Sequence, residues 1–192
     1  MGNKIDRRGP DVSNTLLESQ ILPIMDEYKQ VETCVECSAS QLLNVSEVFY
    51  FAQKAVLYPT LPLYDSREQV LTSSCEYALQ RIFRLCDRDG DGLLRDAELN
   101  AFQQICFNEP LAEEELAGVK SVIHAGALHG LQQNGITLDG FLYLHLLFVQ
   151  RGRLETTWTV LRTFGYNDQI QLRDELLVSK SFSFFFSFFF SC

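Results

Sequence analysis

Positive charge is scarce in this sequence. Its 192 residues include 16 Lys and Arg against 25 Asp and Glu, which gives a formal net charge of -9 and a pI near 4.8. A surface that follows nucleic-acid phosphates needs clustered basic side chains, because its binding is driven by counterion release. The composition therefore argues against a nucleic-acid partner and favours cations or basic partners.

The sequence also lacks a secretory hydrophobic segment at its start and a repeated spacing of metal-ligating cysteines. Among its six cysteines, Cys34 and Cys37 form a Cys-x-x-Cys pair that no second pair answers. A structural zinc site needs four ligands, and His124, His129 and His145 lie far along the chain among apolar neighbours. We interpret the cysteines as buried thiols and the histidines as ordinary residues, in a reducing environment that faces the cytosol.

No apolar run is long enough for a membrane-spanning helix, which needs about 20 residues. The aromatic run in "SKSFSFFFSFFFSC", residues 179–192, reaches only about half that length. This segment is of low complexity and unlike the rest of the chain, and we interpret it as an aberrant tail read from a retained intron. The hydrophobic share of 46% is nevertheless ample for a buried core.

Helical periodicity dominates the first third of the chain. A helix is predicted over residues 16–28, and Pro23 is expected to confine the firm part of this helix to a start close before the proline. "VETCVECSA" reads as a strand. Asn44 and Glu47 form a capping pair for a helix over residues 45–57, and the two prolines of "YPTLPLYDSREQ" indicate a linker.

A second helical unit follows the linker. Ser73 and Glu76 form a second capping box, and the helix that they begin leads directly into "DRDGDGLLRDAE". A further helix is predicted to end at residues 108–110, since Pro110 cannot continue it. Two helices flanking one acidic loop are the arrangement expected of an EF-hand.

The loop "DRDGDGLLRDAE" satisfies the pattern D-x-D-x-D-G-x5-E in full. In this pattern three carboxylates and one backbone carbonyl surround a hard cation, glycine allows the sharp turn, and the final glutamate binds with both oxygens. The predicted Ca²⁺ ligands are Asp87, Asp89, Asp91, the carbonyl of Leu93, and Glu98. The net negative loop would hold Mg²⁺ less well, because Mg²⁺ demands stricter geometry. The alternative is a solvated acidic turn.

Arg95 departs from the pattern, since a small oxygen-bearing side chain or a water normally serves at this position. A guanidinium cannot ligate calcium, so a water or the backbone must supply that ligand. We expect a weaker or slower site, not an inactive one.

Residues 111–150 repeat the helix, short strand, helix order without the acidic loop. Aligning the two stretches places Ile136 opposite Leu94 and Gly140 opposite Glu98, so the bidentate ligand is missing. The three aspartate positions fall on His129, Leu131 and Gln133. The repeat indicates a degenerate EF-hand in which Ile136 pairs with Leu94; the alternative is an unrelated helical hairpin.

An amphipathic segment lies directly downstream, with Trp158, Leu161 and Phe164 at helical spacing. A pair of EF-hands exposes an apolar groove when it is open, and these side chains could fill that groove from the same chain. An ordinary core tryptophan is the alternative.

The first residues carry a second motif. Asn3, Lys4 and Asp6 match N-K-x-D, in which the Asp carboxylate accepts from the guanine ring N–H and amino group, the Asn amide bonds the base and the Lys stem covers the ring. Ser38 and Ala39 follow the predicted strand, where the second base-contacting loop of a Ras-like domain lies. No G-x-x-x-x-G-K-[ST] sequence occurs in the 192 residues, although GTP binding derives much of its strength from phosphates and Mg²⁺ held there.

This order of motifs resembles the mitochondrial Rho GTPase (Miro) family, and the stretches "ETCVECSA", "FYFAQKAVLYPT", "AELNAFQQICF", "LDGFLYLHLLFVQRGR" and "ETTWTVLRTFGY" all carry the resemblance. It covers the end of the N-terminal GTPase domain and the first EF-hand pair. The resemblance implies a calcium-responsive GTPase on the cytosolic face of the outer mitochondrial membrane, linked to microtubule motors through adaptor proteins. It also implies that the helix around Trp158 acts as a ligand mimic in the EF-hand groove.

The expected fold is mainly α, with a remnant of a Ras-like α/β domain before an EF-hand pair and a ligand-mimic helix. The expected divisions are a partial GTPase domain (1–57), a linker (58–72), a calcium-binding EF-hand (73–108), a hidden EF-hand (111–150), the ligand-mimic region (151–178) and the tail (179–192).

The expected function is the calcium-binding regulatory portion of such a GTPase in mitochondrial transport and positioning. Ca²⁺ is the expected cofactor, and GTP with Mg²⁺ is expected only in the full-length family, so no catalytic residue is assigned. The alternatives are a GTP-hydrolysing enzyme and a truncated product without a function of its own. Without the family's membrane anchor, this chain is expected in the cytosol.

Overall fold

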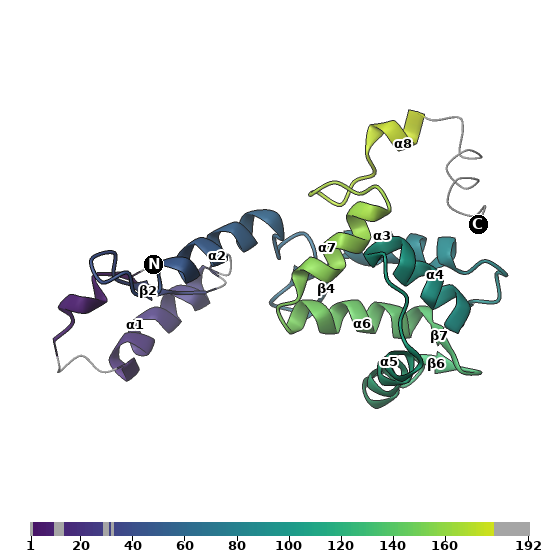
Figure 1. Cartoon of the computed structure of the whole chain (residues 1–192), viewed down its shortest axis with the longest axis horizontal. Helices are drawn as coiled ribbons and strands as arrows, with labels where there is room; N and C mark the ends of the chain where they lie inside the picture. The colour runs from purple at the N-terminus through teal and green to yellow at the C-terminus, as the bar shows by residue number, and fades with distance from the viewer. Residues whose placement is uncertain (1, 10–13, 29–30, 32, 179–192) are drawn as a thin grey trace. The chain divides into compact units, whose positions relative to one another are not determined.

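The computed structural model describes residues 2–9, 14–28, 31 and 33–178 (Figure 1). The chain divides into two compact units, one of residues 1–61 with 66–68 and one of residues 62–65 with 69–192. The junction falls inside the predicted linker. The predicted tail, 179–192, which holds the Phe-rich run, lies outside the described residues.

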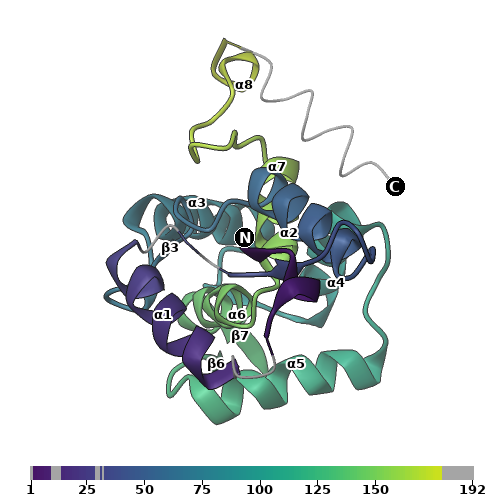
Figure 2. The ribbon, with the colours of Figure 1, turned by 90° about the vertical axis from the view of Figure 1, so that its left-hand side faces the viewer.

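The first unit pairs two short parallel strands with helices beside them. Strand β1 (Gly2–Asn3) pairs with β2 (Glu36–Cys37), with Asn3 opposite Cys37. A 3-10 turn, η1 (Ile5–Arg7), follows β1 directly. Figure 2 shows helices α1 (Asn14–Glu27) and α2 (Val45–Leu57) of this unit.

Three details of the first unit differ from the prediction. Helix α1 begins at Asn14 and carries Pro23 inside it, since a proline removes one helical hydrogen bond without always ending the helix. Asn44 does not cap α2 through its side chain, because its φ is 53° and its Nδ2 instead donates to the Glu36 carbonyl at 3.0 Å. The predicted strand is only two residues long in β2.

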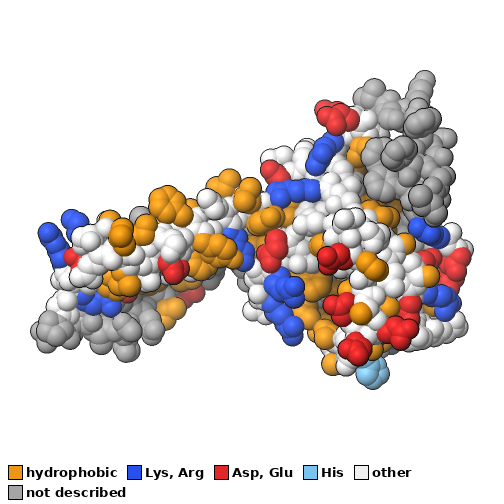
Figure 3. All heavy atoms as spheres, viewed as in Figure 1, with side chains coloured by type: hydrophobic (Ala, Val, Ile, Leu, Met, Phe, Trp, Pro, Cys, Tyr) orange, Lys and Arg blue, Asp and Glu red, His pale blue; other side chains and the backbone are white. Residues whose placement is uncertain are grey.

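Helix α2 has the predicted bounds but none of its residues is buried within the described structure. Phe49, Tyr50, Val56 and Leu57 are each more than half exposed. Figure 3 shows hydrophobic side chains along this helix. The first unit therefore keeps its apolar helix face largely open.

The second unit begins with a small hairpin inside the predicted linker. Strands β3 (Tyr64–Asp65) and β4 (Val70–Leu71) are antiparallel. Leu63 is fully buried, and the Thr72 hydroxyl donates to the Pro62 carbonyl at 2.6 Å. The same hydroxyl accepts from the Cys75 amide at 3.2 Å, so Thr72 caps the next helix and the predicted cap, Ser73, is its first residue.

Two helix–loop–helix segments make up most of the second unit. The first has α3 (Ser73–Cys86), β5 (Leu93–Leu94) and α4 (Asp96–Phe107). The second has α5 (Glu113–Gly126), β6 (Leu131–Gln132), β7 (Gly135–Thr137) and α6 (Leu138–Gln150). Their strands form one sheet in the order β5-β7-β6, and Leu94 lies opposite Ile136 as predicted. This pairing joins the two loops.

One core serves both segments and the helix that follows them. Helix α7 (Leu154–Thr163) contacts α4 and α6, and α8 (Asp174–Val178) comes last. The ring of Phe141 meets Phe83 and Phe102 edge-on, with centroids 5.8 and 5.5 Å away. The mainly α fold is confirmed, and among the described residues no helix is both long and apolar enough to span a bilayer.

Candidate calcium site and guanine-type loop

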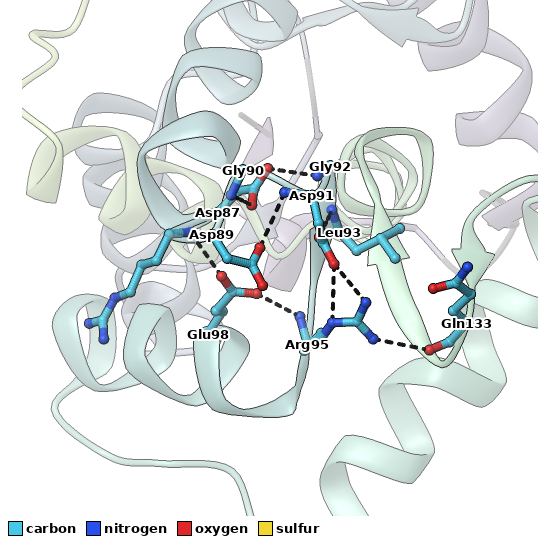
Figure 4. A network of polar contacts seen from close by, with 10 residues as sticks. Asp87, Asp89, Gly90, Asp91, Gly92, Leu93, Arg95, Glu98 and Gln133 are labelled. Atoms are coloured by element: carbon cyan, nitrogen blue, oxygen red, sulfur yellow. Dashed lines mark hydrogen bonds and ion pairs between the residues drawn. The ribbon is translucent and has the colours of Figure 1, made fainter.

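Three carboxylates meet where α3 ends. Asp87, Asp89 and Asp91 each offer one oxygen to a group whose members all lie within 4.8 Å of one another. Gly90 and Gly92 have φ of 72° and 81°, in the left-handed region that glycine adopts without strain. The loop can therefore turn sharply enough to aim all three carboxylates inward (Figure 4).

Backbone amides hold these carboxylates in place. Asp87 accepts from the amides of Gly90 and Gly92, both at 2.9 Å. Asp89 Oδ1 accepts from the Asp91 amide at 3.2 Å, and Asp91 Oδ1 accepts from the Leu93 amide at 2.8 Å. Each amide directs its partial positive charge at a carboxylate, which offsets the mutual repulsion of the acids.

Glu98 reaches the same loop from the first turn of α4. Its side chain is buried, and its two oxygens accept from the amides at the two ends of the loop, Arg88 at 2.8 Å and Arg95 at 3.0 Å. Leu93 lies in β5, where its backbone is fixed by pairing with Thr137. The predicted ligands therefore come from the end of one helix, a strand and the start of the next helix.

This donor set suits calcium. All the groups are hard oxygen donors, and Ca²⁺ prefers carboxylate and carbonyl oxygens in a flexible loop, whereas Zn²⁺ prefers nitrogen and sulfur. When bound, Ca²⁺ would supply a positive centre joining α3 to α4. Asp87, Asp89, Asp91, the Leu93 carbonyl and Glu98 are the residues that would hold it.

Arg95, the one departure from the loop pattern, bonds one of the predicted ligands. Its guanidinium donates to Asp91 Oδ2 from Nη2 at 2.6 Å and from Nε at 3.2 Å. The hydrogen bond from Arg95 holds the pKa of the Asp91 carboxyl below its usual range. The sequence did not predict this pair, because Asp91 and Arg95 lie outside a helix, where i, i+4 spacing is no signal for an ion pair.

The second loop is closed by its own backbone. The Thr137 hydroxyl donates to the His129 carbonyl at 2.7 Å, and the Thr137 amide donates to the Gly130 carbonyl at 3.0 Å. Gly140 lies so close to Gly130 that a Cβ at Gly140 would be 2.1 Å from the Gly130 oxygen. At Gly140, the position equivalent to Glu98, the second loop is therefore filled by packed backbone atoms and has no room for a ligand side chain.

The residues predicted to fill a groove lie in the core. Trp158 and Leu161 have no exposed surface, and Phe164, at the end of α7, is half-buried and stacks on Phe102 with ring centroids 6.4 Å apart. The guanidinium of Arg162 lies over the Trp158 ring at 5.0 Å. Helix α7 thus presents one apolar face to both helix–loop–helix segments.

The predicted guanine-contacting residues are also brought together. The parallel pairing of β1 and β2 puts Asn3 next to Cys37 and directs both strands toward the same edge. The Ser38 hydroxyl donates to the Asp6 carboxylate, and this bond lowers the pKa of Asp6. Lys4 has a φ of 69°, and Ala39 is exposed beside Ser38.

Most cysteines are buried thiols as interpreted, but Cys34 is exposed. Burial raises the pKa of both Cys75 and Cys86 to about 12, so these thiols stay protonated at neutral pH. Of the histidines, His145 is buried whereas His124 and His129 are exposed. In the part of the chain that the structure describes, the aspartate cluster is the one group with metal-ligand spacing.

Comparison with known proteins places these features in a family. A family model described as "EF hand associated" matches residues 109–184. A Mitochondrial Rho GTPase 1 from Mycosarcoma maydis is 54% identical over 92% of this chain. This chain is a homologue of the mitochondrial Rho GTPases over nearly its whole length.

Other members of the mitochondrial Rho GTPase family agree. The Mitochondrial Rho GTPase 1 proteins of Arabidopsis thaliana and of Cryptococcus neoformans are 52% and 50% identical, each over 94% of this chain. The chain spans 27% to 31% of the length of these relatives. The similarity to a mitochondrial Rho GTPase is thus confirmed for nearly the whole sequence and for about a third of the relatives' length.

Proposed function

We propose that this chain is the calcium-binding regulatory portion of a mitochondrial Rho GTPase. The observation that carries the proposal is the cluster of Asp87, Asp89 and Asp91, with Glu98 aimed at the same loop from α4. Four carboxylates held by loop amides are an arrangement whose charge repulsion a divalent cation relieves. Calcium binding would therefore stabilise the angle between α3 and α4.

A change at the loop has a direct route to α7. Glu98 lies in the first turn of α4, which packs against α7 and stacks Phe102 on Phe164. Leu94 of β5 pairs with Ile136 of β7, which connects the first loop to the second segment. We infer that the occupied loop shifts α4 and thereby changes the packing of α7, which is the ligand mimic predicted from the family.

The wider role follows from the family and is proposed at that level. The relatives' name supports a mitochondrial protein that binds and hydrolyses GTP. We infer a role on the cytosolic face of the outer membrane, in transport and positioning along microtubules through motor-adaptor proteins. The contact of Asp6 with Ser38 supports a contribution to guanine recognition, while the phosphate-binding motif is absent from these 192 residues.

The test uses Trp158, the sole tryptophan of the sequence. Titration of the chain with Ca²⁺ should change Trp158 fluorescence saturably, because α7 packs on the helix that carries Glu98. Glu98→Gln removes the bidentate carboxylate but keeps the side-chain shape, and it should weaken binding by about 100-fold. Equal Ca²⁺ dependence in that variant would show that the signal arises elsewhere.

A further inference from the structure

The guanidinium of Arg95 is held against the proposed calcium site by three contacts from two loops. Two of its nitrogens bond Asp91 Oδ2, and Nη1 lies 3.4 Å from the Gln133 carbonyl of the second loop. Figure 4 shows Arg95 between Asp91 and Gln133. A forked cation held at both ends is positioned in advance, so it loses little side-chain freedom in keeping this place.

Asp91 has both of its oxygens engaged. Oδ1 accepts from the Leu93 amide and Oδ2 from Arg95. An ion that binds Asp91 must therefore share an oxygen with one of these donors or displace it. The amide belongs to the loop backbone and moves with it, so Arg95 is the donor that an ion can displace without unfolding the loop.

We propose that Arg95 sets the calcium affinity of this loop by acting as a tethered cation that competes with Ca²⁺ for Asp91. The inference rests on the proposed calcium function and deepens it. Arg95 does not ligate the ion; it holds one of the ligands and repels the ion from a fixed position.

The charges fix the direction of the effect. Asp87, Asp89, Asp91 and Glu98 together carry four negative charges, and Arg95 cancels one of them beside the place where the ion binds. A divalent ion a few ångströms from a guanidinium is repelled even in a high dielectric, and this repulsion corresponds to about tenfold in affinity. The pair is partly exposed, with 45% of the Arg95 side chain and 29% of the Asp91 side chain accessible, so salt should weaken the effect.

The second loop contributes the anchor. Gln133 has a φ of 48°, and it follows β6 where the short β6–β7 connection turns. Gly135 begins β7, and its close approach to Leu93 leaves no room for a Cβ, which would be 2.9 Å from the Leu93 Cβ. The degenerate loop is therefore packed against β5 and offers Arg95 a carbonyl in a set place.

The test measures Ca²⁺ binding to the whole chain by calorimetry, with Ca²⁺ alone as the probe. Arg95→Gln removes the charge and should bind Ca²⁺ about tenfold more tightly than wild type at low salt, with a smaller gain at high salt. Arg95→Lys keeps the charge but not the fork, and its affinity should stay closer to wild type than to Arg95→Gln. Unchanged or weaker binding by Arg95→Gln would overturn the proposal.

Arg88→Gln is the matched control, since it removes the same charge from another exposed position of the loop. A gain as large as that of Arg95→Gln would overturn the proposal by showing that net charge alone matters. As a second measurement, the NMR resonance of the Arg95 Nε–H should shift on Ca²⁺ addition, and an unmoved resonance would contradict competition at Asp91. Failure of wild type to bind Ca²⁺ at all would instead refute the proposed function.

Discussion

Glu98 and Gly140 occupy equivalent positions in two paired loops and have opposite consequences. Glu98 brings a buried carboxylate whose oxygens accept from the amides of Arg88 and Arg95. Gly140 brings no side chain, and its backbone packs on Gly130. The loss of the glutamate at Gly140 could be predicted from the sequence. The contact between Gly140 and Gly130 could not, because it depends on how the loop closes in three dimensions.

Gly140→Ala should destabilise the second unit by about 1–3 kcal/mol, because the new methyl group overlaps the Gly130 carbonyl and the loop must open. Thermal unfolding followed by Trp158 fluorescence measures this loss. Gly118→Ala is the matched control: Gly118 lies in α5 with open space around its Cβ position, so alanine should stabilise the helix by about 0.5–1 kcal/mol. Equal effects of the two substitutions would contradict the close packing of the second loop.

The helices were more predictable than the side chains that cap them. The apolar stripe and the proline that follows it predict α2 with its observed bounds, Val45–Leu57, because the stripe repeats over several turns and proline does not continue a helix. The predicted side-chain cap of α2 was wrong, because Asn44 has a left-handed backbone and its side chain donates to the Glu36 carbonyl instead. The hydroxyl that caps α3 belongs to Thr72, which also bonds Pro62, a tertiary contact that local spacing does not contain.

Helices α6 and α7 are joined by a buried polar pair that sequence reasoning also missed. His145 Nδ1 lies 3.1 Å from the Thr157 hydroxyl, and neither residue has more than slight exposure. The rings of Phe141 and Phe148 flank the imidazole. Burial lowers the pKa of His145 to about 3, so the imidazole is neutral in the folded protein.

This pair makes the second unit sensitive to acid. The folded pKa of His145 lies below its unfolded value of about 6.5, so the unfolded chain binds the proton more readily between the two. Stability is complete above about pH 6.5 and falls with pH by about 1.4 kcal/mol per unit. Urea unfolding in EDTA between about pH 6 and pH 5 should show this slope reduced in His145→Gln and retained in His124→Gln, whose side chain is exposed. An unreduced slope in His145→Gln would place the acid sensitivity elsewhere.

At the scale of the whole molecule, the two units differ in how much core they hold. The second contains the buried aromatic and aliphatic side chains of five packed helices, α3 to α7. The first leaves α2 without a buried residue among those described. The prolines of the predicted linker indicated a division between the units within residues 58–72. The β3–β4 hairpin could not be predicted, because two-residue strands show no detectable periodicity.

Both loops share one sheet, yet only the first of the two has the carboxylate ligands for calcium. The second lacks the carboxylates at His129, Leu131 and Gln133, and its backbone is closed by Thr137 and Gly140. A measurement on the whole chain must therefore give the number of bound Ca²⁺ ions and show which loop binds them.

The stoichiometry of Ca²⁺ binding to the full chain, measured by calorimetry with Glu98→Gln beside the wild type, shows whether the first loop is the calcium site. We expect one Ca²⁺ per chain for the wild type and no saturable binding at the same concentrations for Glu98→Gln. Two equivalents of Ca²⁺, or one equivalent that persists in Glu98→Gln, would contradict this expectation.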